Sequence, residues 1–373
     1  MTFALYTNSI SPHQLPLARE LVKALGADNY RYVYMEELSP GRAELGWNAE
    51  REPWLLRHGT EEAWEWLRNA DVVMMQHPRD WDLFEGRLKR GKTCLYASER
   101  WFKPISLVGK IKSGSCALEM DGRLRMMVPA YRRMARRFVE LATKYDNFKV
   151  LSVGVWAKRD FLWLGLPEDR LVDWGYFVEK SLVVSRQSLV VSRQSLVGSR
   201  QSLVGSRQTL KLLWVGRMIG WKRVDTIVRA VAAAAKTRDV ALTLVGNGPE
   251  RMSLERLAKR LGVDGRVKFV TNVPIDEVRA LMRQNDVYVL SSDGQEGWGA
   301  ALSEALAEGM EVIGTFEAGS SATILPPERL YHAGDYNVLA DMIVNVGKLP
   351  AAEFSPWTVD AAAKRVLGLV KRD

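Results

Sequence analysis

The sequence predicts an α/β protein with two Rossmann-like domains joined by a linker. Three observations support this fold class: short apolar segments alternate with amphipathic helical segments, the alternation occurs in two series, and a repetitive segment separates the series. Strands that alternate with helices typically form right-handed βαβ units on a parallel sheet. The length of 373 residues also suits two domains of ordinary size better than one.

The first series, residues 1–178, is expected to form the N-terminal domain. Its strand-like segments are TFALYT, YRYVYM, DVVMMQH, TCLYAS and FKVLSVG. Its helix-like segments are HQLPLARELVKAL, EEAWEWLRNA, FEGRLKRG and the longer YRRMARRFVELATKY. Ligands of doubly wound sheets bind beyond the carboxyl ends of the strands. We therefore expect site residues in the loops that follow the strands.

Residues 179–208 form the predicted linker, most of which is a seven-residue tandem repeat. SLVVSRQ occurs at 181–187 and 188–194, and SLVGSRQ occurs at 195–201 and 202–208. The repeat lacks the a/d spacing of a coiled coil, and Val, Ser and Gly are weak helix formers. We interpret it as an extended or disordered linker, with an added helix as the alternative.

The second series, residues 209–355, is expected to form the C-terminal domain. Its strand-like segments are TLKLLWVG, ALTLVG, VKFVT, VYVLSS and EVIGT. Its helix-like segments are RVDTIVRAVAAAAK, ERMSLERLAKRLG, IDEVRALMRQN and AALSEALAEG. Two Rossmann-like halves joined by a linker would place a ligand in the cleft between them.

The composition is that of an ordinary globular protein, with 47% hydrophobic and 26% charged residues. The two cysteines, Cys94 and Cys116, belong to no Cys/His cluster, which argues against a structural zinc site and a disulfide framework. The sequence shows no signal-peptide pattern and no apolar run long enough for a transmembrane helix. We therefore expect a cytoplasmic protein that attaches at most to the inner face of a membrane.

The formal net charge of +9 is concentrated in two segments. Residues 100–137 carry ten basic and two acidic side chains, and residues 181–208 carry four arginines and no acid. The chain lacks the broadly spread basic surface of a nucleic-acid-binding protein, so we expect no nucleic-acid partner. Residues 100–137 could approach an anionic membrane or an acidic glycan, with a solvated helical face as the simple alternative.

The richest candidate site is the segment DGQEGWGAALSEALAEG. Glu296 follows the strand VYVLSS, and Gly297, Trp298 and Gly299 precede a predicted helix. Glycines let the backbone approach a ligand, and free amides at a helix start attract phosphate or sugar oxygens. Glu304 lies one helical turn later, where a carboxylate can accept several sugar hydroxyls. Of the thirteen tryptophans, we assign only Trp298 to a ligand loop and the others to the cores or interfaces.

Two further segments contribute basic residues and glycines. In LLWVGRMIGWKRVD, Gly216 ends a strand, and Arg217 and Lys222 lie in the loop beyond it. Two cations at the carboxyl end of a strand can neutralise a diphosphate leaving group, although a basic loop is often only solvated. LVGNGPE adds Gly246 and Gly248, and a lone GxG of this kind is weak evidence for nucleotide binding.

The order VGR(x4)K, LVGxGP, a strand ending in SS and EGWG(x4)E resembles family 4 of the retaining glycosyltransferases, which have the GT-B fold. The resemblance is continuous over about residues 210–319. It implies that Glu304 holds the ribose of the donor and that Glu296 contacts the transferred sugar. It also implies that Arg217 and Lys222 bind the diphosphate and stabilise its developing charge.

The same resemblance has further implications. The backbone of residues 297–299 would meet sugar and phosphate, and residues 356–373 would form a helix that packs back on the N-terminal domain. The chain also departs from the family pattern, because Glu308 and Glu311 replace the usual Cys and Pro and AGSSA at 318–322 replaces GGxxE. These changes leave the identity of the donor open.

The N-terminal domain offers weaker candidates, which could face the cleft. His13 follows the first strand, and Glu99 and Arg100 follow the strand TCLYAS. A locally hydrogen-bonded side chain is an equal alternative for His13, and the donor-contacting histidine that the family often carries near Glu99 is absent. Asp80 and Asp82 form a DxD, a motif that binds manganese in glycosyltransferases of the other major fold; we predict no metal site here.

The resemblance therefore predicts a metal-independent retaining glycosyltransferase that needs no cofactor. It would move a hexose-type sugar from a UDP or GDP donor to a glycan or lipid-diphosphate-linked acceptor in surface polysaccharide or glycoconjugate biosynthesis. Retention without an obvious nucleophile suggests same-face attack, in which a leaving-group phosphate oxygen accepts the proton of the acceptor. The alternatives are a non-catalytic GT-B subunit and a dinucleotide-dependent oxidoreductase, and the GxGxxG arrangement that the oxidoreductase requires is not found.

Overall fold

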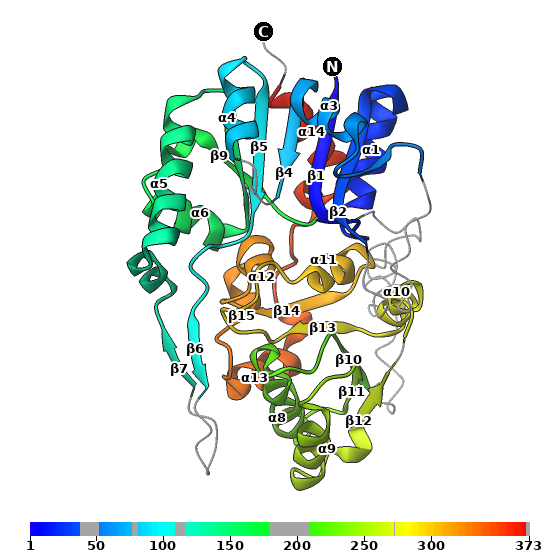
Figure 1. The fold of residues 1–373 in the computed structure, drawn as a ribbon. Helices are drawn as coiled ribbons and strands as arrows, with labels where there is room; N and C mark the ends of the chain where they lie inside the picture. Colours follow the sequence, from blue (N-terminus) through cyan, green and yellow to red (C-terminus); the bar gives the residue numbers. More distant parts are fainter. Residues whose placement is uncertain (38–51, 77–80, 109–116, 179–208, 272, 371–373) are drawn as a thin grey trace. The chain divides into compact units, whose positions relative to one another are not determined.

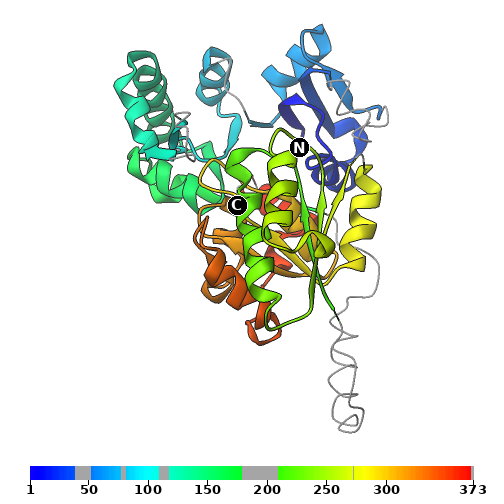
Figure 2. The same ribbon diagram turned by 90° about the horizontal axis from the view of Figure 1, so that it is seen from below.

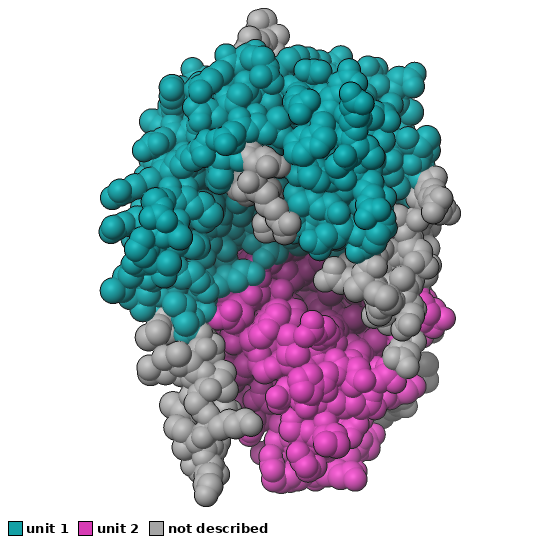
Figure 3. All heavy atoms as spheres, in the orientation of Figure 1, with its two compact units in different colours: residues 1–40, 48–177, 359–373 teal, residues 41–47, 178–358 magenta. Residues whose placement is uncertain are grey.

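The structure is a computed structural model of the chain. It describes residues 1–37, 52–76, 81–108, 117–178, 209–271 and 273–370. The chain divides into two compact units (Figure 3): unit 1 comprises residues 1–40, 48–177 and 359–373, and unit 2 comprises residues 41–47 and 178–358. The tandem repeat lies outside the described residues, so its interpretation as a linker stays a prediction.

Unit 1 is built on a seven-stranded parallel sheet in the order β3-β2-β1-β4-β5-β8-β9 (Figure 1). Its strands are β1 (Phe3–Ser9), β2 (Tyr30–Glu36), β3 (Leu55–Arg57), β4 (Val72–Met75), β5 (Thr93–Ser98), β8 (Phe148–Val153) and β9 (Leu171–Trp174). Successive strands are added toward one edge of the sheet up to β3 and toward the other edge from β4 onward, as in a doubly wound fold. The strands β1, β4 and β5 are almost entirely buried, which suits a sheet covered on both faces.

Five helices of unit 1 lie between its strands along the chain, and a sixth ends the described part of the unit. They are α1 (Leu15–Leu25), α3 (Glu61–Asn69), α4 (Trp81–Lys89), α5 (Pro129–Lys144), α6 (Val155–Trp163) and α14 (Val359–Gly368). An aromatic core holds α4 and α5 on the sheet, since Phe84 and Phe138 both make edge contacts with Phe148 of β8. The last helix, α14, packs against α1.

The basic segment 100–137 is not a single helical face. It contains the antiparallel hairpin of β6 (Ile105–Val108) and β7 (Ala117–Met120), the 3₁₀ segment η2 (Gly122–Met127) and the first half of α5. Its charges are therefore spread over several elements of unit 1. No helix in the described part of the chain is both long and apolar enough to cross a bilayer.

Unit 2 repeats the doubly wound design with a six-stranded parallel sheet in the order β12-β11-β10-β13-β14-β15. Its strands are β10 (Leu210–Val215), β11 (Val240–Val245), β12 (Val267–Val270), β13 (Val287–Leu290), β14 (Glu311–Thr315) and β15 (Leu330–Tyr331). Its helices are α8 (Val224–Ala234), α9 (Arg251–Arg260), α10 (Ile275–Gln284), α11 (Ala300–Ala307), α12 (Gly319–Ile324) and α13 (Tyr336–Val344). The helices α8 and α13 lie side by side against the sheet (Figure 2).

The fold class predicted from the alternation of segments is confirmed, since each unit carries a Rossmann-like parallel sheet. Carboxyl ends of neighbouring parallel strands meet at one edge of each sheet, and this is where loops can assemble a site. The predicted site residues follow β1 and β5 in unit 1, and β10, β11 and β13 in unit 2.

Candidate functional site

In unit 2, the loop after β10 packs tightly on the loop after β11. The amide of Met218 donates to the carbonyl of Asn247 over 2.8 Å. A Cβ on Gly246 would lie 1.9 Å from the carbonyl oxygen of Gly216, and a Cβ on Gly248 would lie 2.3 Å from that of Met218. Gly246 also has a φ of 129°, which side chains with a Cβ rarely adopt. The two glycines therefore fix the shape of the edge where Arg217 lies.

The two predicted cations of this edge differ in their surroundings. The side chain of Arg217 is exposed. Lys222 ends the 3₁₀ turn η4 (Gly220–Lys222), and its ammonium lies 4.5 Å from the centroid of the Trp221 ring. Its carbonyl accepts a hydrogen bond of 2.6 Å from Ser291, directly after β13. Lys222 is thus held in place, whereas Arg217 is open to solvent.

Lys222 forms an ion pair with Glu296. Glu296 is 8% exposed, and its carboxylate also accepts a hydrogen bond of 2.8 Å from Ser292. Removing two charges from water is costly, and a pair that is this buried is weak evidence for stability. We therefore regard the pair as a candidate functional feature. The structure brings together a cation and an acid that lie 74 positions apart in the sequence.

Glu304 lies on α11, near the same cluster. Burial raises the pKa of Tyr288 on β13, and the negative charges of Glu296 and Glu304 raise it further. Both carboxylates therefore lie close enough to act on the same phenol. The predicted acid pair is thus gathered around the carboxyl end of β13.

The loop of residues 297–299 joins this cluster to α11. Gly299 precedes the helix with a φ of 89°, and the carbonyl of Trp298 accepts a hydrogen bond of 2.8 Å from the amide of Ser320. The Trp298 side chain is completely buried, and its indole donates to Ser303 over 3.2 Å. Trp298 lies in the expected loop, but its ring is a core anchor. Only backbone atoms of this residue could contact a ligand here.

The departures from the family pattern have structural partners. The carboxylate of Glu308 is paired with Arg283 at 2.8 Å and with Arg279 at 3.7 Å. Glu311 pairs with the buried Arg329. These acids are matched by arginines of unit 2, so they add no unpaired charge to the Lys222–Glu296 region.

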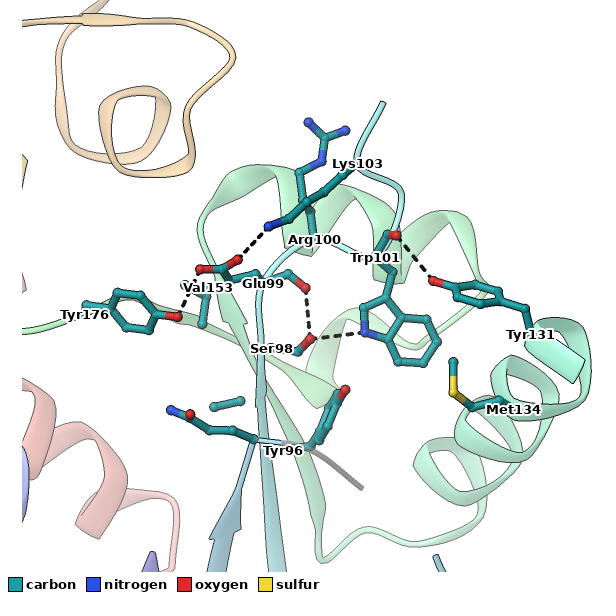
Figure 4. Close-up of a pocket in the computed structure, with 12 residues that line it drawn as sticks. Tyr96, Ser98, Glu99, Arg100, Trp101, Lys103, Tyr131, Met134, Val153 and Tyr176 are labelled. Atoms are coloured by element: carbon teal, nitrogen blue, oxygen red, sulfur yellow. Dashed lines mark hydrogen bonds and ion pairs between the residues drawn. The ribbon is translucent and has the colours of Figure 1, made fainter. Parts of the chain in front are cut away.

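In unit 1, a cavity of about 490 Å³ opens at the carboxyl ends of β4, β5 and β8 (Figure 4). We call it cavity A. Its lining comprises Gln76, Tyr96, Ala97, Ser98, Glu99, Arg100, Trp101, Lys103, Tyr131, Met134, Val153 and Tyr176. The lining combines aromatic rings with a few polar groups, which is typical of ligand sites.

Glu99 is the acidic residue in the lining of cavity A. Its carboxylate accepts a hydrogen bond of 3.0 Å from the hydroxyl of Tyr176 and pairs with Lys103 at 2.9 Å (Figure 4). The ring of His13 stacks on Tyr176, with centroids 6.2 Å apart and planes 9° apart. The structure thus links His13 to Glu99 through Tyr176. Arg100 lines the same cavity.

Sequence reasoning missed several residues of these sites. Tyr176 and Lys103 in unit 1 were not among the candidates, nor was Ser292 in unit 2. Ser292 and Tyr176 each follow a strand at its carboxyl end, so their position along the chain was an available signal. Asp82 of the DxD is exposed and pairs with Arg137, whereas Asp80 lies outside the described residues. The described residues contain no cluster of metal-ligating side chains.

Residues 199–343 match the family described as glycosyl transferases group 1. Over 129 residues the chain is 34% identical to N-acetyl-alpha-D-glucosaminyl L-malate synthase of Bacillus anthracis. This alignment covers 34% of this chain and 33% of that protein. Over 128 residues it is 33% identical to the lipopolysaccharide core biosynthesis glycosyltransferase LpsE of Rhizobium meliloti, with 34% of each chain covered. The matched region spans about a third of the length of these relatives.

Solved structures resemble the chain over both units. The apo form of the lipopolysaccharide outer core galactosyltransferase WaaB gives a TM-score of 0.65 with 14% identity and covers 99% of both chains. HepE of Anabaena in complex with UDP and glucose gives a TM-score of 0.60 with 16% identity, covering 99% of this chain and 97% of that one. At these identities the likeness shows the fold, and the fold is the one predicted.

Proposed function

We propose, from the match of residues 199–343 to the glycosyl transferases group 1 family, that the chain is a retaining glycosyltransferase. It moves a hexose-type sugar from a nucleotide-diphosphate donor to a glycan or lipid-linked acceptor in polysaccharide or glycoconjugate biosynthesis. The donor binds unit 2, and the acceptor is received by unit 1 through cavity A. The reaction uses no metal ion, because protein cations take over the stabilisation of the leaving group.

The observation that carries this proposal is the Lys222–Glu296 pair at the carboxyl edge of the unit 2 sheet. A donor places its diphosphate and its sugar next to each other, so it needs a cation and a hydroxyl acceptor side by side. Lys222 provides the cation, and the Glu296 carboxylate provides the acceptor. Such preorganised charges in a partly buried site stabilise charge that develops during reaction.

Arg217 and Lys222 have complementary parts in the proposed mechanism. As the bond between the anomeric carbon and the phosphate oxygen breaks, negative charge accumulates on the diphosphate. Lys222 is held in place beside Glu296, and the exposed Arg217 can move onto the phosphates as they bind. The acceptor oxygen then attacks from the face that the diphosphate leaves, and a phosphate oxygen accepts its proton. Glu304 holds the ribose from α11.

The nucleotide is proposed only as UDP or GDP. The Anabaena structure contains UDP and glucose, and a mycobacterial relative that is 30% identical over 118 residues is named a GDP-mannose-dependent mannosyltransferase. A panel of UDP- and GDP-sugars, scored by thermal shift and by donor hydrolysis, identifies the donor. Hydrolysis of one nucleotide sugar would support the proposal that the protein is an enzyme. Nucleotide binding with neither hydrolysis nor transfer by any sugar would favour a non-catalytic subunit.

Variants of Lys222 and Glu304 test the proposed donor site. Lys222→Ala should lower donor hydrolysis about 100-fold, as expected when one charge-stabilising group is removed. Glu304→Gln should weaken nucleotide binding about 10-fold, since a charged hydrogen-bond partner is lost. Lys236→Ala removes an exposed lysine of unit 2 that follows the C-terminal end of α8, and this variant serves as the control. Equal activity of the Lys222 and Lys236 variants would contradict the assignment.

We also propose that unit 1 contacts an anionic membrane when it receives a lipid-linked acceptor. Arg132, Arg133 and Arg136 are exposed on α5. Immediately before α5, Met127 is 77% exposed and Val128 is 54% exposed. Basic side chains next to exposed apolar ones suit a bilayer surface, where the cations meet lipid headgroups and the apolar groups enter the interface.

A further inference from the structure

A second cavity of about 460 Å³ lies in unit 1 next to cavity A, and we call it cavity B. Its lining comprises Arg100, Phe102, Pro104, Asp121, Gly122, Arg123, Arg159, Asp160 and Trp163. Arg100 lines both cavities, so they meet at one guanidinium. Cavity B therefore carries three arginines and two aspartates on its wall.

Arg100 is buried without full compensation. Its side chain is 9% exposed, and it donates to the carbonyl of Phe102 over 3.0 Å. Its Nε is buried and makes no hydrogen bond within the described residues. The carboxylate of Asp160 lies 3.9 Å from that nitrogen, and it already accepts a hydrogen bond of 2.8 Å from the amide of Phe102. A buried guanidinium with an unsatisfied donor has a place for another acceptor.

Arg159 adds a second guanidinium, whose charge acts on the carboxylates of Asp121 and Asp160 without a direct ion pair. Its side chain is exposed, and it forms no ion pair in the described part of the chain. It stacks over the ring of Trp156 at 4.5 Å, while Arg100 lies 5.9 Å from the centroid of the same ring. Burial lowers the pKa of Arg100, the negative charge of Asp160 raises it in part, and the positive charge of Arg159 lowers it again. Asp160 offsets part of the repulsion between the two guanidiniums, and a bound anion would offset more of it.

The third arginine is already matched. Arg123 pairs with Asp121 and lies 5.5 Å from the centroid of the Trp163 ring. Trp163 is 49% exposed and packs edge-on against Phe102, with centroids 5.0 Å apart. Cavity B thus has two guanidiniums with capacity for an anion and an aromatic wall beside them.

We infer that cavity B binds the anionic group, a phosphate or a carboxylate, of the acceptor whose sugar occupies cavity A. The inference rests on the proposed function for its reference to an acceptor. Guanidinium groups bind the oxygens of phosphates and carboxylates in pairs, which gives both strength and orientation. The aromatic wall accommodates the apolar face of a sugar or linker next to the charged group. Neutral glycans would lack this anchor.

Calorimetric titration tests the site with glucose 6-phosphate and glucuronate, with glucose as the neutral probe. The wild-type protein should bind both anions more tightly than glucose, and high salt should weaken that difference. Arg159→Ala should weaken binding of both anions at least about 5-fold and leave glucose unchanged. Arg256→Ala, which removes an exposed arginine of unit 2, is the matched control. Equal anion binding by the two variants would overturn the inference, as would glucose binding as tightly as glucose 6-phosphate.

Vesicles that contain phosphatidate distinguish the two sources of a phosphate. If Arg159→Ala weakens binding to the vesicles more than binding to glucose 6-phosphate, the anion is a lipid headgroup. If it weakens binding to glucose 6-phosphate more, the anion is a free sugar phosphate. Donor hydrolysis by the wild-type protein is measured separately. Its absence, together with Arg159-dependent anion binding, would contradict the proposed transferase and leave an anion site. Donor hydrolysis without Arg159-dependent anion binding would overturn cavity B alone.

Discussion

Gly246 shows how one residue sets the geometry of the candidate donor site. A methyl group there would lie 1.9 Å from the carbonyl of Gly216, and the φ of 129° adds backbone strain. Gly246→Ala should therefore lower the free energy of unfolding by at least about 2 kcal/mol. Urea denaturation measures this loss. Gly265→Ala, where an added Cβ meets no atom within 4 Å, should change stability by less than about 0.5 kcal/mol.

Cys94 should behave as an inert core thiol. Burial raises its pKa from 9.0 to about 11, so only a small fraction is thiolate at pH 8. In a Cys116→Ser variant, where Cys94 is the sole cysteine, a thiol reagent should react at the rate of unfolding. Rapid labelling of the native protein at pH 8 would contradict the burial that we describe.

The same thiol makes a pH-dependent contribution to stability. Because the folded pKa lies above the unfolded value, rising pH ionises the unfolded chain first and favours unfolding. Stability should therefore fall between about pH 9 and pH 11, with Cys94 accounting for about 1 kcal/mol between pH 8 and pH 10. Cys94→Ala removes this contribution, so the variant should lose less stability than the wild type over that interval. Urea unfolding at both pH values measures the difference, and identical losses would contradict it.

Individual site residues were predictable where a motif constrained them, and less so where packing decided. The segment EGWG(x4)E located Glu296 and Glu304, and the fold gathers them near Tyr288. The ring of Trp298 could not be placed from sequence, because an exposed loop tryptophan and a buried one have the same neighbours along the chain. Its burial depends on contacts with Ser303 and Trp357, which only the fold supplies.

Among the elements, the C-terminal end of α3 depends on a buried arginine of α4. The Arg87 guanidinium donates to the carbonyls of Leu67 and Ala70, each over 2.8 Å. These are among the carbonyls that a helix leaves without intrahelical partners. Arg87→Met should lower the free energy of unfolding by about 2–4 kcal/mol, because buried acceptors lose their donors.

Lys89→Met on the same helix provides the control for Arg87. Lys89 is 59% exposed and pairs only with Glu85 among the described residues, so its removal should cost less than about 1 kcal/mol. Thermal and urea unfolding of both variants measure the difference. Equal losses would mean that the carbonyls at the end of α3 do not depend on Arg87.

Long periodic elements were predictable, and short ones were not. The patterns of β1, β5, α5 and α8 identified these elements directly. The three residues of β3 are too few for a period to be seen, and α6 combines apolar and charged residues without a clear amphipathic stripe. The hairpin of β6 and β7 interrupts the alternation of strands and helices. The alternation pattern therefore did not predict these two strands.

At the scale of the whole molecule, the concentration of positive charge on unit 1 predicts membrane binding. The protein should sediment with vesicles that contain anionic lipid at low salt and be released at high salt. Alanine at Arg132, Arg133 and Arg136 together should weaken binding about 100-fold, because each basic residue contributes about 1 kcal/mol near an anionic surface.

A matched triple variant separates this surface from general charge effects. Arg256, Lys259 and Arg260 are exposed on α9 of unit 2, and their replacement by alanine removes the same charge. It should leave vesicle binding close to that of the wild type. Equal loss by the two triple variants, or no sedimentation of the wild type, would contradict the proposed membrane surface.

The return of α14 to unit 1 has a consequence for how the chain is synthesised. The described residues of unit 2 all lie between Val178 and Thr358, whereas unit 1 is completed only by residues from Val359 onward. During translation, unit 2 can therefore close its sheet while the surface of α1 that receives α14 is still bare. A ribosome stalled before α14 would carry one finished domain and one open domain, and chaperones that bind apolar surface would be expected on the open one.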